Sequence, residues 1–196
     1  MIGTKRYPFP DTFPDALALP DHQFKSLFGR QCVKGWHDLQ QIEAFLRTHR
    51  IARIVELGTG AGMHTLYLGV WAALNGAEVW TVDLSDEAKT SGAAPLAKTA
   101  GLPIVWINAD VLTVAPDLIA GAYNAPGRVL LYADMGIGEL SHWVPLLRPD
   151  DFIVVHNWAS PTSDAELEVL QESGVLVPYE TVTWERSGDH RGFIRA

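Results

Sequence analysis

The chain has 196 residues, and its 23 acidic and 15 basic side chains give a formal net charge of −8. This length suits one domain with a substantial core and is too short for two full α/β domains. The acidic balance argues against a general nucleic-acid binder, because neutralising phosphates requires a surplus of lysine and arginine. The single cysteine, Cys32, excludes an intramolecular disulfide and a cysteine-based zinc site, and it suits a reducing cytoplasm.

Residues 1–34 are interpreted as a proline-rich N-terminal arm, followed by a single domain over 35–196. Four of the first 20 residues are proline. Because proline fixes φ and lacks an N–H donor, the arm is expected to be neither helix nor central strand, and it fits a frayed tail or an ordered flap. The first residues lack the apolar core of a secretory signal, and no run of ~18–20 apolar residues occurs later in the chain, so a cytoplasmic protein without membrane contact is expected.

The predicted elements begin with a helix over about 35–48, where apolar residues recur at spacings of three and four. Short apolar runs then alternate with longer amphipathic ones, which is typical of parallel strands joined by helices and covered on both faces. The expected strands are Arg53–Leu57, Glu78–Val82, Pro103–Ile107, Val129–Tyr132 and Phe152–Val155. The expected helices between them are Met63–Leu74, Ala93–Ala100, Pro116–Ala122 and Gly138–Leu147.

The last predicted helix leads into a hairpin rather than into another parallel strand. Ser163 and Glu166 have the spacing of a capping box at its start, and Gly174 marks its end. Two β-type runs come after it, Val175–Trp184 and Arg191–Arg195, and the turn residues between them predict an antiparallel pairing. The expected fold class is therefore α/β, a Rossmann-like, doubly wound and mostly parallel sheet of about seven strands with a C-terminal antiparallel hairpin.

A glycine-rich turn between the first predicted strand and the next helix is the most informative segment. Gly58, Gly60 and Gly62 allow positive φ angles and let a ligand approach the main chain closely. Glu56 stands just before them, where a carboxylate would repel a pyrophosphate but suits a ligand with an ammonium and a sulfonium group. The alternative is a turn that binds no ligand.

Asp83 ends the second predicted strand, where a carboxylate could accept hydrogen bonds from both hydroxyls of a ribose. The alternative is that it caps the turn before Ser85. Together, Asp83 and the motif Glu56-x-Gly-x-Gly-x-Gly resemble the cofactor site of the class I S-adenosylmethionine-dependent methyltransferases. The resemblance covers the predicted domain and includes the reversed final strand. It implies that the glycine turn holds the methionine part of the cofactor and that Asp83 holds the ribose.

Two further residues fit the same resemblance. Asp110 follows the third strand, where this family often places an acid near the adenine, although an acid there could simply begin a loop. His64 could contact the methionine carboxylate as a neutral imidazole, since a helix N-terminus disfavours a charged one; otherwise it is a surface histidine. A nicotinamide site would require Gly-x-Gly-x-x-Gly, but Met63 occupies the third glycine position counted from Gly58.

Polar side chains at the ends of the fourth and fifth predicted strands are expected to face the acceptor. Asp134 follows the fourth strand, and His156 and Asn157 end the fifth. Their oxygen and nitrogen atoms suit a divalent cation, so these residues are both candidate catalytic residues and candidate metal ligands. His156 could bind a softer metal such as Mn²⁺, Fe²⁺ or Zn²⁺, act as a base on the acceptor, or serve only structure.

Within the superfamily, the chain is most similar in pattern to the catechol-type O-methyltransferases and to the cephalosporin hydroxylase and rhamnosyl O-methyltransferase group. Phe28–Gln31 and Gly35–Leu39 resemble an N-terminal stretch of the second group. The chain departs from both groups because His156 replaces the first acid after strand five, which weakens a Mg²⁺ site. It also lacks the His or Lys that usually follows the acid at Asp134, a familiar general base.

The resemblance therefore implies a class I methyltransferase fold and an enzyme that uses S-adenosylmethionine to methylate a small molecule on oxygen. The alternatives are a protein that binds the cofactor without transferring methyl groups and an NAD-dependent oxidoreductase. A small acceptor is expected rather than a nucleic acid, because the charge is acidic and no large recognition domain is inserted. A bound divalent metal and a homodimer are both left open.

Overall fold

The computed structural model describes residues 36–111, 113–114, 121–124, 126–134, 140–156, 161–179 and 190–196. The predicted N-terminal arm, Asn157 and most of the predicted helix at 116–122 lie outside these residues. The domain boundary near residue 35 therefore stays a prediction.

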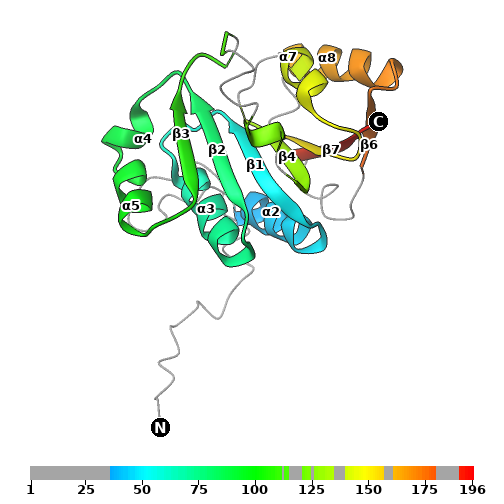
Figure 1. Cartoon of the computed structure of the whole chain (residues 1–196). Helices are drawn as coiled ribbons and strands as arrows, with labels where there is room; N and C mark the ends of the chain where they lie inside the picture. The colour runs from blue at the N-terminus through cyan, green and yellow to red at the C-terminus, as the bar shows by residue number, and fades with distance from the viewer. Residues whose placement is uncertain are drawn as a thin grey trace, which may run out of the picture.

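A seven-stranded sheet forms the centre of the described molecule, in the order β3-β2-β1-β4-β5-β7-β6 (Figure 1). Strands β1 to β5 pair in parallel with their neighbours, whereas β7 pairs antiparallel with both β5 and β6. This arrangement confirms the predicted α/β class, the parallel core and the antiparallel C-terminal strands. The strands are β1 (Ile51–Leu57), β2 (Glu78–Asp83), β3 (Ile104–Asn108), β4 (Arg128–Ala133), β5 (Phe152–His156), β6 (Leu176–Pro178) and β7 (His190–Arg195).

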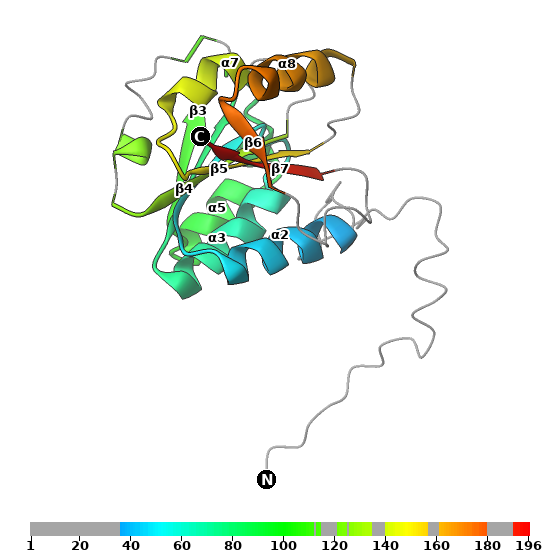
Figure 2. The same ribbon diagram turned by 90° about the vertical axis from the view of Figure 1, so that its right-hand side faces the viewer.

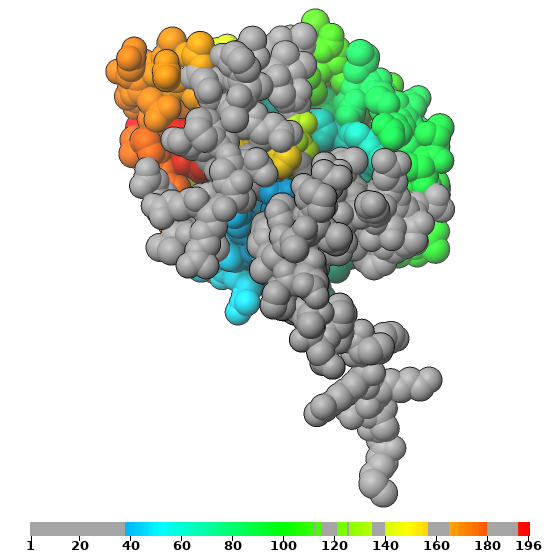
Figure 3. Space-filling model, turned by 180° about the vertical axis from the view of Figure 1, so that it is seen from behind, coloured from blue at the N-terminus to red at the C-terminus, as the bar shows by residue number. Residues whose placement is uncertain are grey.

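Helices cover both faces of the sheet, with α2, α3 and α5 on one face and α7 and α8 on the other (Figure 2). From behind, the α8 end and the α4–α5 end lie on opposite sides of the molecule (Figure 3). Within the described residues, every helix is too short or too polar to cross a membrane. The helices are α2 (Trp36–Thr48), α3 (Met63–Asn75), α4 (Glu87–Thr90), α5 (Ala93–Thr99), α7 (Leu140–Trp143), the 3-10 turn η1 (Val144–Leu146) and α8 (Pro161–Glu172).

Alternate side chains of each central strand build the two halves of the core. On β4, Leu130 and Tyr132 pack on the α2–α3 face, whereas Leu131 and Ala133 pack on the α7–α8 face. Their exposed fractions are 6% or less. Fully burying an aliphatic side chain contributes about 1.5–3 kcal/mol, so strands that are apolar at consecutive positions are stabilised only when both faces are covered.

The start of α8 differs from the prediction. The helix begins at Pro161 rather than at Ser163, because proline is favoured in a first helical turn, where its missing N–H has no intrahelical partner to lose. The carboxylate of Glu166 does not cap its own helix. Its Oε1 accepts a hydrogen bond of 2.6 Å from the N–H of Ser141, in the first turn of α7, and so ties the two helices together.

Candidate active site

The parallel strands β1 to β5 end at one edge of the sheet (Figure 1), and the predicted site residues stand at or just after these strand ends. In register, Leu57 of β1 pairs with Val82 of β2 and with Ala133 of β4, which in turn pairs with Val155 of β5. The carboxyl ends of parallel strands form the crevice in which open α/β sheets bind ligands. The residues just after these strand ends therefore face a shared space.

The turn after β1 takes a shape that glycine adopts most readily. Gly58, Gly60 and Gly62 have φ angles of 92°, 52° and 80°, all in the left-handed region. A Cβ on Gly62 would lie 2.8 Å from the Cβ of Ala93, so a larger residue does not fit there. The N–H of Gly58 donates to the carbonyl of Val82 at 2.9 Å, which ties the turn to β2.

The carboxylate of Asp83 fastens the glycine turn to the end of β2. Its Oδ2 accepts a hydrogen bond of 2.8 Å from the N–H of Gly60, and its Oδ1 accepts one of 2.7 Å from the N–H of Ser85. Asp83 therefore does cap the turn before Ser85, as the alternative interpretation expected. Each carboxylate oxygen can accept a further hydrogen bond, so this capping role is compatible with binding a ribose.

Glu56 is completely buried, with an exposed fraction of 0%. Its Oε1 accepts a hydrogen bond of 2.8 Å from Nδ1 of His64, and its Oε2 accepts hydrogen bonds from the hydroxyls of Thr65 (2.5 Å) and Thr81 (2.7 Å). These donors offset the cost of burying a charge. Because the carboxylate is occupied in the interior, direct contact between Glu56 and a cofactor stays a prediction, and His64 is the side chain through which it can act.

His64 is 6% exposed, so the alternative of a surface histidine is wrong. Its Nδ1 carries the hydrogen that it donates to Glu56, because a carboxylate only accepts. Its Nε2 is buried and has no hydrogen-bond partner among the described residues. The ring packs against Tyr132, with centroids 4.7 Å apart. A buried nitrogen without a partner is costly, which makes Nε2 a candidate contact for a bound ligand.

Asp38, Asp134 and His156 form a second carboxylate–imidazole group, and they come from α2, the end of β4 and the end of β5. Nδ1 of His156 donates to Oδ1 of Asp134 at 2.7 Å, and Nε2 lies 3.6 Å from Oδ2 of Asp38. His156 and Asp38 are 8% and 7% exposed. The structure thus brings two of the three predicted acceptor-side residues together, and Asn157 lies outside the described residues.

Tyr132 lies next to both carboxylate–imidazole groups. Burial is the main cause that raises the pKa of its hydroxyl well above the ordinary value, and the carboxylates of Asp134, Asp38 and Glu56 raise it further. The phenol therefore keeps its hydrogen across the physiological range.

Asp110 follows β3 at the same edge of the sheet. Its carbonyl accepts hydrogen bonds from the N–H groups of Thr113 (3.0 Å) and Val114 (2.7 Å), and the preceding Ala109 donates to the carbonyl of Asp83 at 2.9 Å. Asp110 thus begins a turn beside the end of β2. The position is compatible with a role near an adenine, which stays a prediction.

The divalent-metal interpretation at His156 stays a prediction, because Asn157, one of its three residues, lies outside the described residues. In the part of the chain that the structure describes, no group of three or more His, Cys, Asp or Glu side chains is arranged to hold a metal ion. The two ring nitrogens of His156 face the carboxylates of Asp134 and Asp38 rather than an open coordination position. The ligand, base and structural roles of His156 therefore all stay predictions.

Comparison with solved structures identifies the architecture. An apo structure of CmcI is 15% identical, with a TM-score of 0.70 over 100% of this chain and 87% of that chain. The O-methyltransferase TomG from Streptomyces achromogenes, solved in complex with SAM, is 16% identical, with a TM-score of 0.56 over 93% of this chain and 86% of that chain. This chain has the class I methyltransferase fold.

The class I methyltransferase fold does not by itself define the acceptor. An rRNA methylase from Streptococcus thermophilus is also similar, at 13% identity and a TM-score of 0.50 over 81% of this chain and 93% of that chain. No family model and no curated protein sequence matches the chain.

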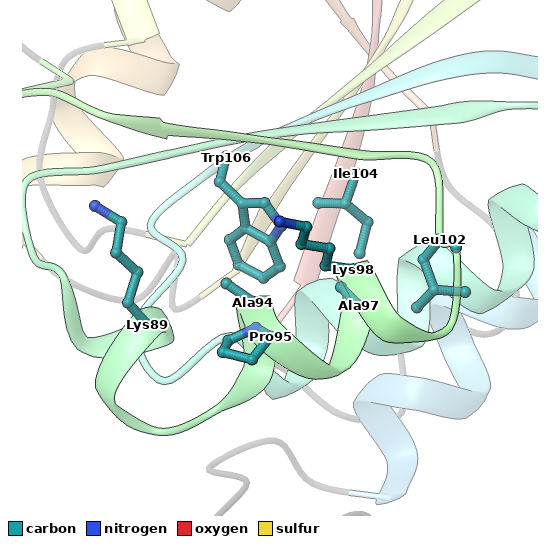
Figure 4. A pocket seen from close by; sticks show the side chains of 9 residues that line it. Lys89, Ala94, Pro95, Ala97, Lys98, Leu102, Ile104 and Trp106 are labelled. Carbon is teal, nitrogen blue, oxygen red and sulfur yellow. The ribbon is translucent and has the colours of Figure 1, made fainter.

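A hollow of about 970 Å³ lies at the outer edge of this methyltransferase fold, between β3 and α5 (Figure 4). Apolar side chains and the indole of Trp106 line it, with Lys89 and Lys98 on either side. A Cβ on Gly62 would lie 3.3 Å from Cη2 of Trp106, so the indole reaches the glycine turn. Among the described residues that line it there is no acid and no histidine, so the hollow is distinct from the polar groups described above.

Sequence reasoning missed the polar residues that support the predicted ones, namely Asp38, Thr65, Thr81 and Tyr132. One signal was available in the helix before β1. Asp38 stands four and seven residues before Ile42 and Phe45, both of which are buried, so helical periodicity places its carboxylate on the inward face. The remaining residues lie within apolar runs and carry no sequence signal of their own.

Proposed function

We propose that this protein is an S-adenosylmethionine-dependent methyltransferase that methylates a small molecule on an oxygen atom. The observation that carries the proposal is the glycine turn, held by the carboxylate of Asp83 and lying above the buried pair of Glu56 and His64. Such a turn exposes the main chain at the carboxyl edge of the sheet without large side chains. The acidic residues favour a cationic cofactor over one that carries a pyrophosphate.

In the proposed complex, Gly58, Gly60 and Gly62 hold the methionine end of the cofactor. His64 contributes Nε2, and Glu56 fixes the orientation of that ring through Nδ1. With its hydrogen on Nδ1, a neutral His64 accepts at Nε2, so it suits the ammonium group of the methionine rather than the carboxylate.

The other end of the cofactor is assigned to two carboxylates. The remaining lone pairs of Asp83 accept the ribose hydroxyls, since its present hydrogen bonds leave one acceptor position on each oxygen. Asp110, in the turn after β3, lies toward the adenine.

S-adenosylmethionine, when bound, supplies an electrophilic methyl carbon on its sulfonium. The chain must hold the acceptor oxygen in line with that carbon and receive its proton. We assign the proton to Nε2 of His156, because Nδ1 already carries the hydrogen donated to Asp134. Asn157 is proposed to orient the acceptor. The acceptor R–OH then becomes R–OCH₃, with S-adenosylhomocysteine and the proton as the other products.

The proposal also covers the class of acceptor, the cellular location and the oligomeric state. A net charge of −8 repels a phosphate backbone, which favours a small acceptor over a nucleic acid. We also propose a cytoplasmic protein. Whether two copies form a homodimer is tested by light scattering coupled to size-exclusion chromatography.

Thermal-shift titration tests the cofactor assignment. S-adenosylmethionine and S-adenosylhomocysteine are expected to stabilise the protein and NADH is not, with about 2.7 kcal/mol gained at a hundredfold excess over Kd. Asp83→Asn is expected to reduce this gain. The matched control is Asp86→Asn, which removes an exposed carboxylate that pairs with Lys89 in the neighbouring turn. Stabilisation by NADH alone would overturn the proposal.

Methyl transfer is then tested with labelled S-adenosylmethionine and a panel of phenols and alcohols. Labelled ether products support the proposal in full. Tight cofactor binding without transfer to any member of a broad panel favours the alternative of a catalytically degenerate protein.

A further inference from the structure

The first turn of α2 buries a carboxylate at the carboxyl edge of the sheet. Asp38 is 7% exposed, and the later inward residues of the helix, Leu39, Ile42 and Phe45, are apolar and equally buried. Burying a carboxylate is costly unless a partner compensates it, and a hydrophobic residue would serve packing better. The position therefore calls for a specific partner.

The imidazole of His156 is a partner that the described residues supply. Asp134 holds Nδ1 at 2.7 Å, within hydrogen-bond distance, and Asp38 lies on the other side of the ring, 3.6 Å from Nε2. At 3.6 Å the two atoms are too far apart for a direct hydrogen bond and too close for another heavy atom to lie in line between them, so a hydroxyl group could contact both only from one side. The ring is thus held between a strand end and a helix that are nearly 100 residues apart in sequence, β4 and α2.

The two carboxylates do not act alike on the ring. Because Asp134 accepts a hydrogen from Nδ1, the neutral ring has its lone pair on Nε2, and this atom faces Asp38. Nε2 and Oδ2 of Asp38 are then both acceptors, so a hydroxyl group beside the pair can share its one hydrogen between them. Asp38 therefore determines what Nε2 faces, whereas Asp134 determines which nitrogen carries the hydrogen.

We propose that Asp38 is a positioning residue for His156, which directs Nε2 of the ring toward the space where the acceptor hydroxyl enters. This role rests on the proposed function, since it concerns the same base and the same acceptor. It adds a residue from outside the strand ends and makes the helix before β1 part of the acceptor site.

A purely structural role would also explain a buried aspartate here. Asp38 lies in the first turn of α2, where a negative charge interacts favourably with the helix dipole. The two roles differ in their effect on His156, because a capping residue stabilises the helix and leaves the imidazole unchanged. The test must therefore measure the protonation and the surroundings of the two ring nitrogens of His156.

Long-range ¹H–¹⁵N spectra of the full chain with ¹⁵N-labelled histidine provide this reading, and His156→Gln assigns the signals of that ring. In the unaltered protein, the proposal requires one set of signals with the hydrogen on Nδ1. Asp38→Asn, which keeps the side-chain shape and removes the charge, is expected to shift the Nε2 signal of His156. Glu43→Gln, on the same helix and hydrogen-bonded to Tyr67 instead, is the matched control and leaves the ring signals unchanged.

The proposal fails if the His156 signals of Asp38→Asn match those of the unaltered protein, or if the unaltered ring carries its hydrogen on Nε2. The second result can be read even when Asp38→Asn does not fold. Where methyl transfer is measurable, Asp38→Asn is expected to lower kcat at least tenfold and to leave the KM for S-adenosylmethionine unchanged. If Asp38→Asn shifts the Nε2 signal but the unaltered protein transfers no methyl group, the shift supports the positioning role. The missing activity then counts against the proposed function alone.

Discussion

The two carboxylate–imidazole groups of this molecule differ in how completely they are closed. Around Glu56, every partner lies within 2.8 Å, and the carboxylate is entirely buried. Around His156, one carboxylate lies at 2.7 Å and the other at 3.6 Å, and Asp134 is partly exposed. The first group has the features of a fixed support, whereas the second is held less tightly and is partly open to solvent. Changes to the first should therefore act on stability and changes to the second on turnover.

The largest expected effect is on turnover, from His156→Gln. Losing the proposed base should lower the rate of methyl transfer by about 10²–10⁴-fold. Glutamine has a similar size and can still donate a hydrogen bond to Asp134, so the loss in unfolding free energy should be smaller than for Glu56→Ala. Initial rates and urea denaturation measure the two effects. His49→Gln, just before the opposite end of β1, is the control and should retain the rate. Full turnover by His156→Gln would remove this residue from the mechanism.

Glu56→Ala should show the reverse pattern, with its largest effect on stability. The change leaves the donors of His64, Thr65 and Thr81 buried without an acceptor, which should lower the unfolding free energy by about 3 kcal/mol or more. Urea denaturation provides the measurement. Glu78→Gln removes a half-exposed carboxylate instead and should cost less than about 1 kcal/mol. Equal losses in the two variants would contradict the distinction between the two groups.

Gly62→Ala in the glycine turn and Gly76→Ala at the end of α3 separate backbone strain from steric contact. Both glycines have a left-handed φ, 80° and 67°, so each variant should lose about 1–2 kcal/mol from strain. Only at Gly62 would the new Cβ meet a neighbour, at 2.8 Å from Ala93, whereas at Gly76 it meets nothing within 4 Å. Gly62→Ala should therefore lose about 1 kcal/mol more and bind S-adenosylmethionine more weakly. Equal unfolding free energies would show that the turn can widen.

The smallest expected effect is confined to alkaline pH and concerns Tyr132, the residue between the two groups. Its pKa is raised in the folded protein, so above pH ~10 the unfolded chain loses a proton that the folded protein keeps. This stability is present below that pH and declines above it by up to about 1.4 kcal/mol per pH unit. Tyr132→Phe should reduce the decline between pH 9 and pH 11 in urea denaturation. An unchanged pH dependence would show that the phenol ionises alike in both states.

Much of the fold could be predicted from the sequence because its signals are local. Consecutive apolar positions in each run predicted strands covered on both faces, and the glycines after the helices marked helix ends, as at Gly76 and Gly174. The start of α8 was wrong because a capping-box spacing is a weaker signal than proline in the first turn. The position of β7 between β5 and β6 could not be deduced, since strand pairing across the sheet depends on distant partners.

The candidate site was predictable where strand ends supply it and hidden where a helix does. Asp83, Asp134 and His156 were found because topology alone places the carboxyl ends of parallel strands together. Asp38 was missed because its contact with His156 depends on how α2 packs across the sheet, which no local pattern specifies. The position of Glu56 before the glycines predicted a contact with the cofactor. In the structure its carboxylate instead accepts hydrogen bonds from His64, Thr65 and Thr81, which depends on side-chain geometry that the sequence does not specify.

The insertion of β7 between β5 and β6 has a consequence for the order of assembly. β7 is the last strand along the chain, yet it has a hydrogen-bonded neighbour on each side, and Arg195 also exchanges backbone hydrogen bonds with Asp150 and Asp151. Until that segment docks, two strand edges stay open, and open edges are sites of intermolecular pairing. Refolding should therefore end when β7 pairs with β5 and β6. Aggregation during refolding should depend on how quickly residues 190–196 form these pairs.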